Sequence, residues 1–443
     1  MALAALDKIM EEAIERQRTG RFAEAEALYR RVIAERPRDP VANHNFAVLT
    51  AQRGAVEDAL SHFKLALEAE PGQPVYWLSY ARALLASGRP AQALRLLQSG
   101  SRSGLAGAAF KALLAQAQGG RGDELAARGD VEGAIEAYRA ALAIDPDFAD
   151  AHFHLGSILS EKSLVAEGFA HFIRRAELVH GQAPGPAAGD MPPHRLKHDR
   201  EQRDHLESLG VQDMFHLGDG GRVSGPAVNP ANRSPELLAL WRNAQPQIVV
   251  LDDFLTPVAL AKLRAFCAES TIWRRNYDAG YIGATPQDGF ACPLLAQIAE
   301  EIHAGWPQIF GPHRFRYLGA FKYDSELSRG TNTHADNSAV NVNFYITPDE
   351  TNLDPESGGM EIWNVAAPDE TTMRRLNSDE AAVQDFLKRA DATSIIVPHR
   401  ANRALFFNSA LFHKTDRCAF REGYLNKRIN VSLLFGEFGA PTR

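Results

Sequence analysis

The first half of the chain repeats a sequence pattern every 34 residues, and this period restricts the fold more than any other feature. At this interval a glycine is followed five residues later by an alanine and nine residues later by a large apolar residue. These triplets are Gly20, Ala25 and Tyr29, then Gly54, Ala59 and Phe63, then Gly88, Ala93 and Leu97. Pro37 and Pro71 end the first two repeats. A fixed period of this length predicts stacked supersecondary units, each in contact with its neighbours.

Two further repeats follow after a seven-residue insertion. Their positions are Gly129, Ala134, Tyr138 and Pro146 in the fourth repeat, and Leu155, Gly156, Gly168 and Phe172 in the fifth. The third repeat has no closing proline, and its segment 100–122 is rich in glycine. We therefore expect a short second helix or a bend in the stack at that position.

The pattern resembles the tetratricopeptide repeat, whose helix–turn–helix unit has 34 residues. The resemblance covers residues 5–180 and implies an N-terminal all-α solenoid over residues 1–180. In such a unit the small residue lets neighbouring helices approach, the aromatic residue fills the groove between them, and the proline ends the helix.

A solenoid of this kind holds an extended peptide or partner segment more often than it only dimerises or stabilises the chain. We therefore expect a protein or peptide partner, and a homo-oligomer is the alternative. The candidate binding face is formed by the first helices of the units. Its residues are Asn43, Asn45, Tyr76, Tyr80, His152 and His154.

Residues 181–193 (GQAPGPAAGDMPP) interrupt the helical pattern and predict a domain boundary. We expect residues 181–245 to form a linker with a connecting helix, and residues 246–443 to form a second domain. In that domain β-type segments dominate, with helices predicted over residues 258–270 and 293–306.

Two other segments contain residues that could belong to a functional site, but the sequence around them does not decide it. Residues 277–288 (YDAGYIGATPQD) predict a loop, which is either a mobile cover for an active site or a plain surface loop. Residues 194–209 (HRLKHDREQRDHLESL) contain three histidines, but no strand flanks them, and we favour a solvated or interface helix over a metal cluster.

The overall composition is that of a globular protein, with 443 residues of which 45% are apolar and 23% charged. A formal net charge of −7 argues against nucleic-acid binding through bulk electrostatics. The three cysteines have no C-x-x-C spacing, so neither a disulfide framework nor a zinc site is predicted. The sequence has no 18-residue apolar run, and it starts with an amphipathic helix rather than a signal peptide. We therefore expect no membrane contact and a cytoplasmic location.

A metal-binding pattern lies in the second half, where His334-Ala335-Asp336 is followed 77 residues later by His413. Two histidines and a carboxylate form the facial triad that holds non-haem Fe(II) and leaves coordination positions open. In an extended segment residues i and i+2 share a face, so His334 and Asp336 can reach one metal ion. Arg428 lies 15 residues after His413, where such a site would anchor the carboxylate of an oxo-acid co-substrate.

The H-x-D tripeptide is common by chance, so the prediction depends on the strands around it. We expect strands over residues 318–323, 339–347 and 403–407, and another that begins at Arg428. His399 is a rival third ligand, but its segment PHRAN predicts a turn, and we favour His413.

Together with Gly358-Gly359, which precedes a further predicted strand, these elements resemble the Fe(II)- and 2-oxoglutarate-dependent dioxygenases. The closest likeness is to the prolyl 4-hydroxylase-like branch, over residues 245–440. It implies a C-terminal double-stranded β-helix, a jelly roll with flanking helices. It further implies that His334, Asp336 and His413 bind Fe(II) as the catalytic centre. Arg428 would pair with the distal carboxylate of 2-oxoglutarate.

Three more residues are candidates for binding the co-substrate. Asn430 and Ser432 share a strand face with Arg428, and Tyr323 on a preceding strand could hydrogen-bond the co-substrate. The pattern departs from the branch in one respect, because its members usually place a lysine about ten residues after the distal histidine. Lys427 is adjacent to Arg428 and is expected to face away from the site.

The activity that the resemblance implies is hydroxylation of a C–H bond with O2 and 2-oxoglutarate as co-substrates and ascorbate as a further cofactor. The solenoid favours a protein or peptide substrate. The alternatives are a small-molecule hydroxylase, a non-catalytic tetratricopeptide scaffold or sensor with a degenerate oxygenase domain, and a cupin-like metal enzyme that needs no oxo-acid.

Overall fold

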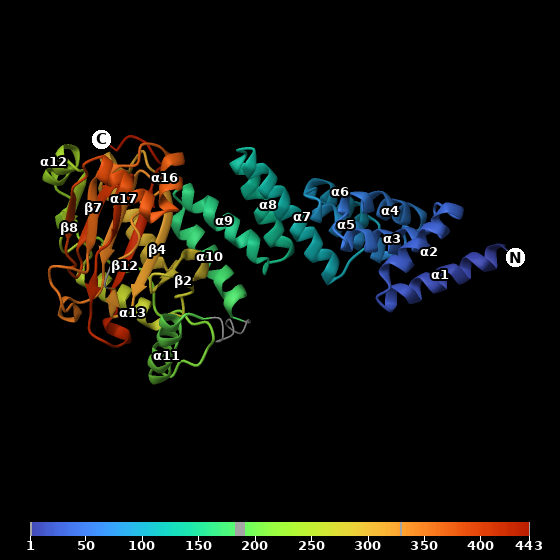
Figure 1. Ribbon diagram of the computed structural model, residues 1–443, viewed down its shortest axis with the longest axis horizontal. Coiled ribbons are helices and arrows are strands. Elements are labelled where there is room, and N and C mark those ends of the chain that lie inside the picture. Colours follow the sequence, from blue (N-terminus) through green and yellow to red (C-terminus); the bar gives the residue numbers. More distant parts are fainter. Residues whose placement is uncertain (1, 182–190, 328–329, 443) are drawn as a thin grey trace. The chain divides into compact units, whose positions relative to one another are not determined.

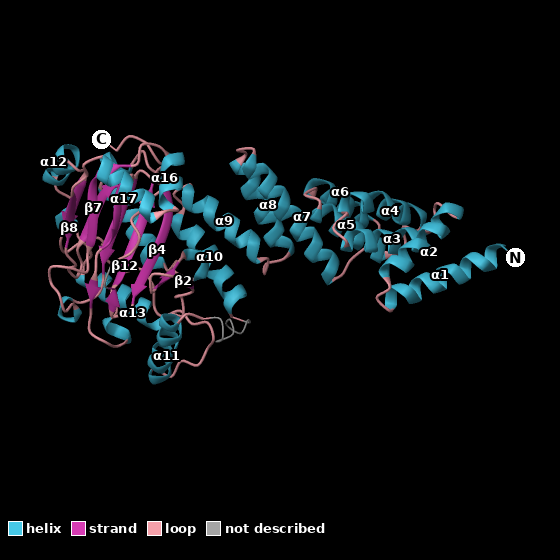
Figure 2. Ribbon diagram, viewed as in Figure 1, coloured by secondary structure: helices cyan, strands magenta, loops and turns pink. Residues whose placement is uncertain are grey.

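The computed structural model describes residues 2–181, 191–327 and 330–442 (Figure 1). The chain divides into two compact units, Met1–His154 and Leu155–Arg443. The first unit is helical, and the second combines helices with the strands drawn in magenta in Figure 2. Within the described residues, no helix has the length and apolar character needed to cross a membrane.

The first unit consists of consecutive helices joined by short turns. They are α1 (Ala2–Arg18), α2 (Phe22–Glu35), α3 (Pro40–Gln52), α4 (Val56–Ala69), α5 (Pro74–Ala86), α6 (Pro90–Arg102), α7 (Ala108–Ala127) and α8 (Val131–Ile144), and α9 (Ala149–Glu161) crosses its end. The recurring glycine lies in the turn within each helix pair, with a left-handed φ of 76° at Gly20 and 87° at Gly54. A Cβ atom is disfavoured in that conformation, which explains why glycine recurs. The predicted helical repeats are confirmed.

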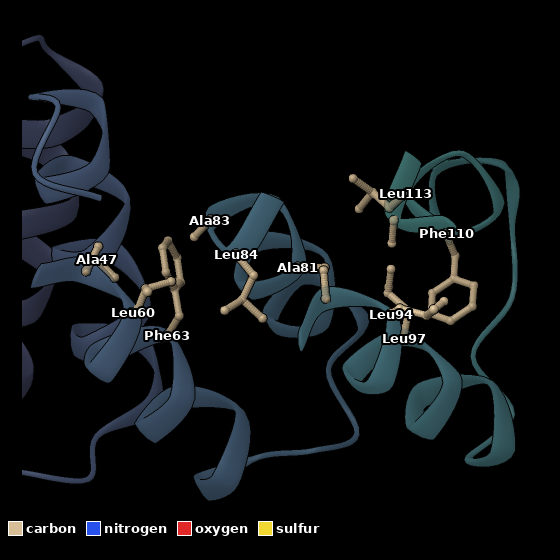
Figure 3. Close-up of a cluster of buried hydrophobic side chains, with 13 residues drawn as sticks. Ala47, Leu60, Phe63, Ala81, Ala83, Leu84, Leu94, Leu97, Phe110 and Leu113 are labelled. Carbon is tan, nitrogen blue, oxygen red and sulfur yellow. The ribbon is translucent and has the colours of Figure 1, made fainter. Parts of the chain in front are cut away.

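Clusters of buried apolar side chains lie between these helices, and Figure 3 shows one of them. The repeat alanines Ala25, Ala59 and Ala93 are completely buried. Because alanine adds a single carbon, the helix backbones approach there, and Phe63 and Leu97 fill the space beside them. The alanine and the large apolar residue four positions later therefore recur because both pack between neighbouring helices.

The glycine-rich segment 100–122 differs from its prediction in one respect, because the second helix of the third repeat is not short. Helix α6 has 13 residues, and α7 continues for 20 residues through most of the segment. A Cβ on Gly122 would lie 2.5 Å from Cε1 of Tyr138, and one on Gly119 would lie 2.7 Å from Cε1 of Phe148. The glycines therefore allow neighbouring aromatic rings to pack directly on the backbone of α7.

Several residues of the predicted binding face have structural roles instead. The Asn43 side chain donates to the carbonyl of Pro37 at 3.0 Å, and His152 Nε2 lies 2.9 Å from the carbonyl of Pro146. Trp77 makes the equivalent bond one repeat after Asn43, with its Nε1 donating to the carbonyl of Pro71 at 2.8 Å. All three side chains are buried and satisfy a carbonyl six residues earlier, so this repeat position holds the preceding loop. Tyr76 is also buried, whereas Asn45, Tyr80 and His154 are half-buried.

The second unit carries helices around antiparallel sheets. Its helices are α10 (Val165–His180), α11 (Pro193–Ser208), α12 (Pro235–Asn243), α13 (Pro257–Glu269), α14 (Pro293–Gly305), α15 (Pro307–Phe310), α16 (Glu370–Asn377) and α17 (Glu380–Arg389), with short 3₁₀ turns η2 (Pro230–Asn232), η3 (Pro286–Asp288), η4 (Asp349–Thr351) and η5 (Tyr424–Asn426). Its strands are β1 (Ile248–Leu251), β2 (Arg275–Tyr277), β3 (Tyr281–Ala284), β4 (Phe315–Tyr323), β5 (Glu326–Leu327), β6 (Val340–Tyr345), β7 (Met360–Ala366), β8 (Ser394–Val397), β9 (Ala404–Asn408), β10 (Leu411–Thr415), β11 (Cys418–Ala419) and β12 (Ile429–Phe435). The helices predicted over 258–270 and 293–306 are thus present as α13 and α14.

A seven-stranded sheet forms the centre of this unit, in the order β1-β9-β6-β12-β4-β3-β2. A three-stranded sheet has the order β10-β7-β8, and β11 pairs with β5. Residues directly opposite each other in an antiparallel pair share a face, so the register defines two faces of the large sheet. We call the face that carries Asn430 and Ser432 the inner face, and the face that carries Lys322 and Ile429 the outer face.

Each face of the large sheet has its own apolar cover. On the inner face Leu405 and Phe407 of β9 pack against Ile362 of β7 and Leu411 of β10, so the two larger sheets lie face to face. On the outer face Phe406 contacts the rings of Phe254, Trp306 and Phe310. The two faces therefore have separate environments.

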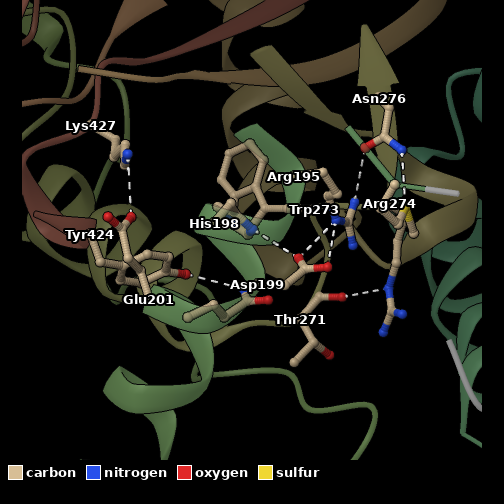
Figure 4. Close-up of polar contacts among 12 residues, drawn as sticks. Arg195, His198, Asp199, Glu201, Thr271, Trp273, Arg274, Asn276, Tyr424 and Lys427 are labelled. Carbon is tan, nitrogen blue, oxygen red and sulfur yellow. Dashed lines mark hydrogen bonds and ion pairs between the residues drawn. The ribbon is translucent and has the colours of Figure 1, made fainter. Parts of the chain in front are cut away.

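Two helices of this unit, α10 and α11, precede its strands in sequence and pack against them. The ring of Phe169 in α10 lies 5.9 Å from that of Phe315 in β4. In α11, Arg195 forms an ion pair with Asp199 at 2.7 Å and hydrogen-bonds Asn276 of β2 (Figure 4). The predicted connecting helix is thus present and is an interface helix. Residues 182–190 of the predicted boundary lie outside the described residues.

Candidate metal centre

The H-x-D segment lies alongside β10, and backbone hydrogen bonds hold it there. The His334 amide donates to the carbonyl of His413 at 2.9 Å, and the His413 amide donates to the carbonyl of His334 at 2.8 Å. The Asp336 amide donates to the carbonyl of Ser409 at 2.9 Å. This extended pairing brings His413 onto one site with Asp336, which lies 77 positions earlier in the sequence.

The three predicted ligand side chains converge. One ligand atom from each of His334, Asp336 and His413 lies within 4.8 Å of the other two. Nε2 of His413 is 3.4 Å from Oδ2 of Asp336, and Nε2 of His334 is 4.0 Å from Oδ1 of the same carboxylate. These separations suit three donors around one ion.

Both imidazoles are oriented by their other ring nitrogen. Nδ1 of His334 lies 3.0 Å from the carbonyl of Asn332, and Nδ1 of His413 lies 2.9 Å from the carbonyl of Leu411. A carbonyl accepts only from a protonated nitrogen, so this arrangement favours the Nδ1–H tautomer and leaves the Nε2 lone pair directed at the carboxylate.

The electrostatics of the group favour the forms that bind metal. Partial burial and the neighbouring His413 lower the pKa of His334, which favours the neutral imidazole. Burial acts to raise the pKa of Asp336, but the histidines and Asn341 outweigh it and keep that pKa low. The His334 side chain is 41% exposed and that of His413 only 3%, so the group is open on the His334 side.

Side chains outside the triad hold these ligands, and the sequence did not predict their role. The Asn341 amide donates to Oδ2 of Asp336 at 2.6 Å. Asn377 bonds both backbone groups of Ala335, and Glu380 accepts from the backbone amide of Thr333. One sequence signal could have indicated the role of Asn341. The alternation Asn341-Val342-Asn343, in a strand of otherwise apolar residues, puts two side-chain amides on one face.

Arg428 is completely buried, and its guanidinium is held by neutral acceptors. Nε donates to the carbonyl of Gly358 at 2.5 Å, Nη2 to that of Gly359 at 3.2 Å, and Nη1 to Oδ1 of Asn430 at 2.8 Å. Within the described residues no carboxylate lies within ion-pair distance of it. A buried cation without a counter-charge is costly, so the site is suited to an anion.

A polar strip on the inner face links the triad to Arg428. On β12 and β6, Ser432 donates to Oδ1 of Asn341 at 3.3 Å, and Asn341 in turn holds Asp336. Further along β6, Asn343 is buried, and its Oδ1 has no hydrogen-bond partner within the described residues. Tyr345 follows on the same face, with its ring centroid 5.1 Å from Cζ of Arg428.

The other residues predicted to bind the co-substrate lie either beside Arg428 or towards the triad. Asn430 holds the guanidinium, whereas Ser432 lies towards the triad through Asn341. The Tyr323 ring lies beneath Arg428, and its hydroxyl is 2.8 Å from Oγ1 of Thr415. Lys427 faces away, as expected, and pairs with Asp324 and Glu201.

The rival ligand His399 does not join the triad. Its side chain is completely buried beside the rings of Tyr345 and Phe420, and Nε2 lies 3.2 Å from the carbonyl of Thr347. Burial, reinforced by the charge of Arg428, lowers its pKa to about 3. His399 is therefore a neutral neighbour of the arginine.

Residues 277–288 do not form the predicted loop. They contain the end of β2, the turn of a β-hairpin and strand β3, followed by the 3₁₀ turn η3. Tyr277 of β2 pairs with Tyr281 of β3, which pairs with Tyr323 of β4. Their rings stack with centroids 4.5 Å and 4.9 Å apart. Cross-strand aromatic pairs stabilise a sheet edge, and Gly280, with φ of 87°, makes the tight turn between the strands.

Comparisons with known proteins match the repeat region. Residues 18–77 and 50–117 match a family model described as tetratricopeptide repeat, and residues 122–163 match one described as TPR repeat. The cellulose synthase operon protein C of Pseudomonas fluorescens (strain SBW25) is 31% identical over 168 residues. That match covers 35% of this chain, and the chain spans 13% of the length of that relative.

Solved structures of low identity also match. MamA from Desulfovibrio magneticus RS-1 (residues 41 to the end) is 23% identical, with 40% of this chain and 97% of the other covered and a TM-score of 0.33. YrrB, described as a TPR protein with an unusual peptide-binding site, is 18% identical, with 39% and 84% covered and a TM-score of 0.31.

The chain therefore has an N-terminal tetratricopeptide repeat region. An antiparallel β-sheet region with helices follows, and it carries a candidate His-Asp-His metal site.

Proposed function

We propose that the second unit is an Fe(II)- and 2-oxoglutarate-dependent oxygenase with a double-stranded β-helix fold, which hydroxylates a C–H bond of a protein or peptide. The observation that carries this proposal is the pairing of the His334, Asp336 and His413 group with the buried, carboxylate-free Arg428 on one polar face. A metal site alone would not require the arginine.

The donor set fits Fe(II). Two imidazoles whose Nδ1 atoms contact carbonyls and a carboxylate held by Asn341 form a facial set, and exposure on the His334 side leaves room for other ligands. When bound, iron and the oxo-acid supply the activation of O2 and the abstraction of hydrogen from the substrate.

The surroundings of Arg428 fit the distal carboxylate of 2-oxoglutarate. The guanidinium is fixed by three acceptors and two aromatic rings, so little conformational entropy is lost when an anion binds. Oδ1 of Asn343 on the same face and Nδ1 of His399 beside Tyr345 have no hydrogen-bond partner among the described residues, and they add polar groups to this face. Tyr323 and Tyr345 exclude water, which strengthens the charge interaction.

The substrate class follows from the repeat region. Repeat solenoids present extended surfaces that bind peptide segments, and a hydroxylase joined to one would act on a protein recruited there. The stacked Tyr277 and Tyr281 form part of the same inner face, and both are half-buried, so they are available to a substrate side chain.

The decisive experiment measures 2-oxoglutarate binding by anaerobic calorimetry in the presence of Mn(II). We expect Arg428→Ala to weaken binding by about 100-fold, because truncating one partner of a buried charge pair costs about 2–5 kcal/mol. Arg428→Lys retains the charge and tests whether the fork geometry matters. The exposed Arg421→Ala is the matched control and should bind normally.

The outcomes separate the alternatives. Metal binding with no effect of Arg428→Ala on activity would favour a cupin-like enzyme. Absence of both metal and 2-oxoglutarate binding would favour a scaffold. Turnover of 2-oxoglutarate that peptides do not stimulate would favour a small-molecule hydroxylase.

A further inference from the structure

A cavity lies on the outer face of the large sheet, away from the triad and Arg428. It has a volume of about 380 Å³, within the range of small-molecule sites. Helix α13 supplies Arg264, Ala265 and Ala268, β4 supplies Lys322, and the chain around β12 supplies Tyr424 and Ile429. Every one of these residues belongs to the second unit.

Lys322 is the unusual residue of this cavity. Its side chain is buried, and within the described residues its Nζ has no hydrogen-bond partner and no carboxylate at ion-pair distance. Nζ lies 3.9 Å from the ring centroid of Tyr424 and 4.5 Å from that of Trp273. The rings attract a cation but accept no conventional hydrogen bond, so an ammonium here lacks an oxygen partner.

The charges of the lining leave an excess of positive charge. Arg264 is exposed at the mouth, and its guanidinium forms no ion pair with any described residue. Lys427 is neutralised by Asp324 and Glu201, which Figure 4 shows in part. Glu269 contributes the one carboxylate among the described lining residues, against Lys322 and Arg264.

The remaining walls are apolar. They consist of Ala261, Ala265, Ala268, Ile346, Leu425 and Ile429. Leu425 is 57% exposed, although it lies next to buried Tyr424. Exposed aliphatic carbon next to an unpartnered buried cation is suited to a ligand with an apolar body and one anionic end.

We propose that this cavity binds a small carboxylate with an apolar body, such as a medium-chain fatty acid, with the carboxylate at Lys322 and Arg264 and the apolar body against α13 and Leu425. The proposed oxygenase function does not require this site.

The cavity also contacts the backbone that positions Arg428. Oγ1 of Thr347, a lining residue, accepts from the Ile429 amide at 2.7 Å and donates to the Lys427 carbonyl at 3.0 Å. These two groups flank Arg428 directly. On β4, Lys322 precedes Tyr323, whose ring lies beneath the guanidinium. An occupant would therefore alter 2-oxoglutarate affinity, a consequence that rests on the proposed function.

The test titrates octanoate into the full chain by calorimetry, without metal or oxo-acid. Octanol, which lacks the charge, and inorganic phosphate, which lacks the apolar body, are the control ligands. Each should bind at least about tenfold more weakly than octanoate. Lys322→Met keeps the packing volume and should weaken octanoate binding by about tenfold or more. Arg264→Ala, at an exposed position, should weaken it as well.

The exposed Lys388→Met on α17 is the matched control and should bind octanoate normally. Failure of the wild-type chain to bind octanoate, or equal binding by octanol, would overturn the site. So would normal binding by both Lys322→Met and Arg264→Ala. If octanoate binds but 2-oxoglutarate affinity does not change, the coupling is wrong. If the wild-type chain does not bind 2-oxoglutarate even without octanoate, the proposed function is wrong instead.

Discussion

Cζ of Arg428 lies 4.4 Å from the ring centroid of Tyr323, and the two residues face each other across adjacent strands of the large sheet. A phenol ring beneath a buried guanidinium supplies a weak attraction and removes water without neutralising the charge. The arginine therefore stays available to an anion. The strand pairing that produces this contact also directs Lys427 to the opposite face.

Tyr323→Phe separates the ring from its hydroxyl. The substitution removes the hydrogen bond to Thr415 and should cost about 1 kcal/mol of unfolding free energy. The ring stays beneath Arg428, so we expect 2-oxoglutarate affinity to stay within about threefold of wild type. Urea unfolding and calorimetry measure the two effects. A loss of affinity as large as that of Arg428→Ala would show that the hydroxyl itself binds the co-substrate.

Asn341→Ala removes the side chain that orients Asp336. Loss of such outer partners costs about 10–100-fold in metal affinity, and we expect that loss here with the fold preserved. Competitive titration with Mn(II) measures it. The matched control is Asn337→Ala, which removes an exposed asparagine next to Asp336 that contacts Glu370 instead. Equal metal affinity in both variants would contradict the role of Asn341.

Lys322→Met should change how stability depends on pH. Burial, with Lys427 acting in the same direction, lowers the pKa of Lys322 to about 7, while Cys267 and Glu201 act the other way. The unfolded chain then binds more protons than the folded one between pH 7 and about 10.5. The cost of the buried charge is fully present below pH 7 and falls as the pH rises through that window.

The methionine variant should therefore be more stable than wild type at pH 6.5. Its advantage should shrink by on the order of 1 kcal/mol per pH unit above pH 7. Urea unfolding at pH 6.5, 8 and 9.5 gives the differences. The other polar groups that line the same cavity are His205, Glu269, Tyr424 and Lys427, and both proteins contain them. Burial and, to a lesser extent, Lys322 lower the pKa of His205, which stays below the window from pH 7 to about 10.5. A constant difference across these pH values would mean that the lysine titrates normally.

Gly122→Ala tests the close packing in the first unit. Alanine normally stabilises a helix interior by about 1 kcal/mol relative to glycine. Here the new Cβ would lie 2.5 Å from the buried Tyr138 ring, and we expect destabilisation by about 1–3 kcal/mol. Gly72→Ala is the control, because no atom lies within 4 Å of its Cβ. Thermal unfolding followed by helical circular dichroism would show a lower midpoint for Gly122→Ala only.

The sequence predicted the features that arise from local spacing. The 34-residue period identified the helix pairs, because each turn needs a left-handed glycine and each helix contact needs a small residue. Period-two spacing placed His334 and Asp336 together, and likewise Arg428 and Asn430. The sequence was misleading at Gly119 and Gly122, which lie inside α7 against aromatic rings, and at residues 277–288, where Gly280 turns a hairpin.

Tertiary structure decided which distant groups meet. The register of β12 with β4 and β6 puts Tyr323 and Tyr345 at Arg428, and the pairing of residue 334 with residue 413 completes the triad. Packing also decided the role of Asn43 and His152. Both were candidates for binding a peptide partner, and both instead hydrogen-bond a backbone carbonyl. Sequence spacing determines which face of its own element a side chain occupies. Its partners depend on long-range pairing and burial, which the complete fold supplies.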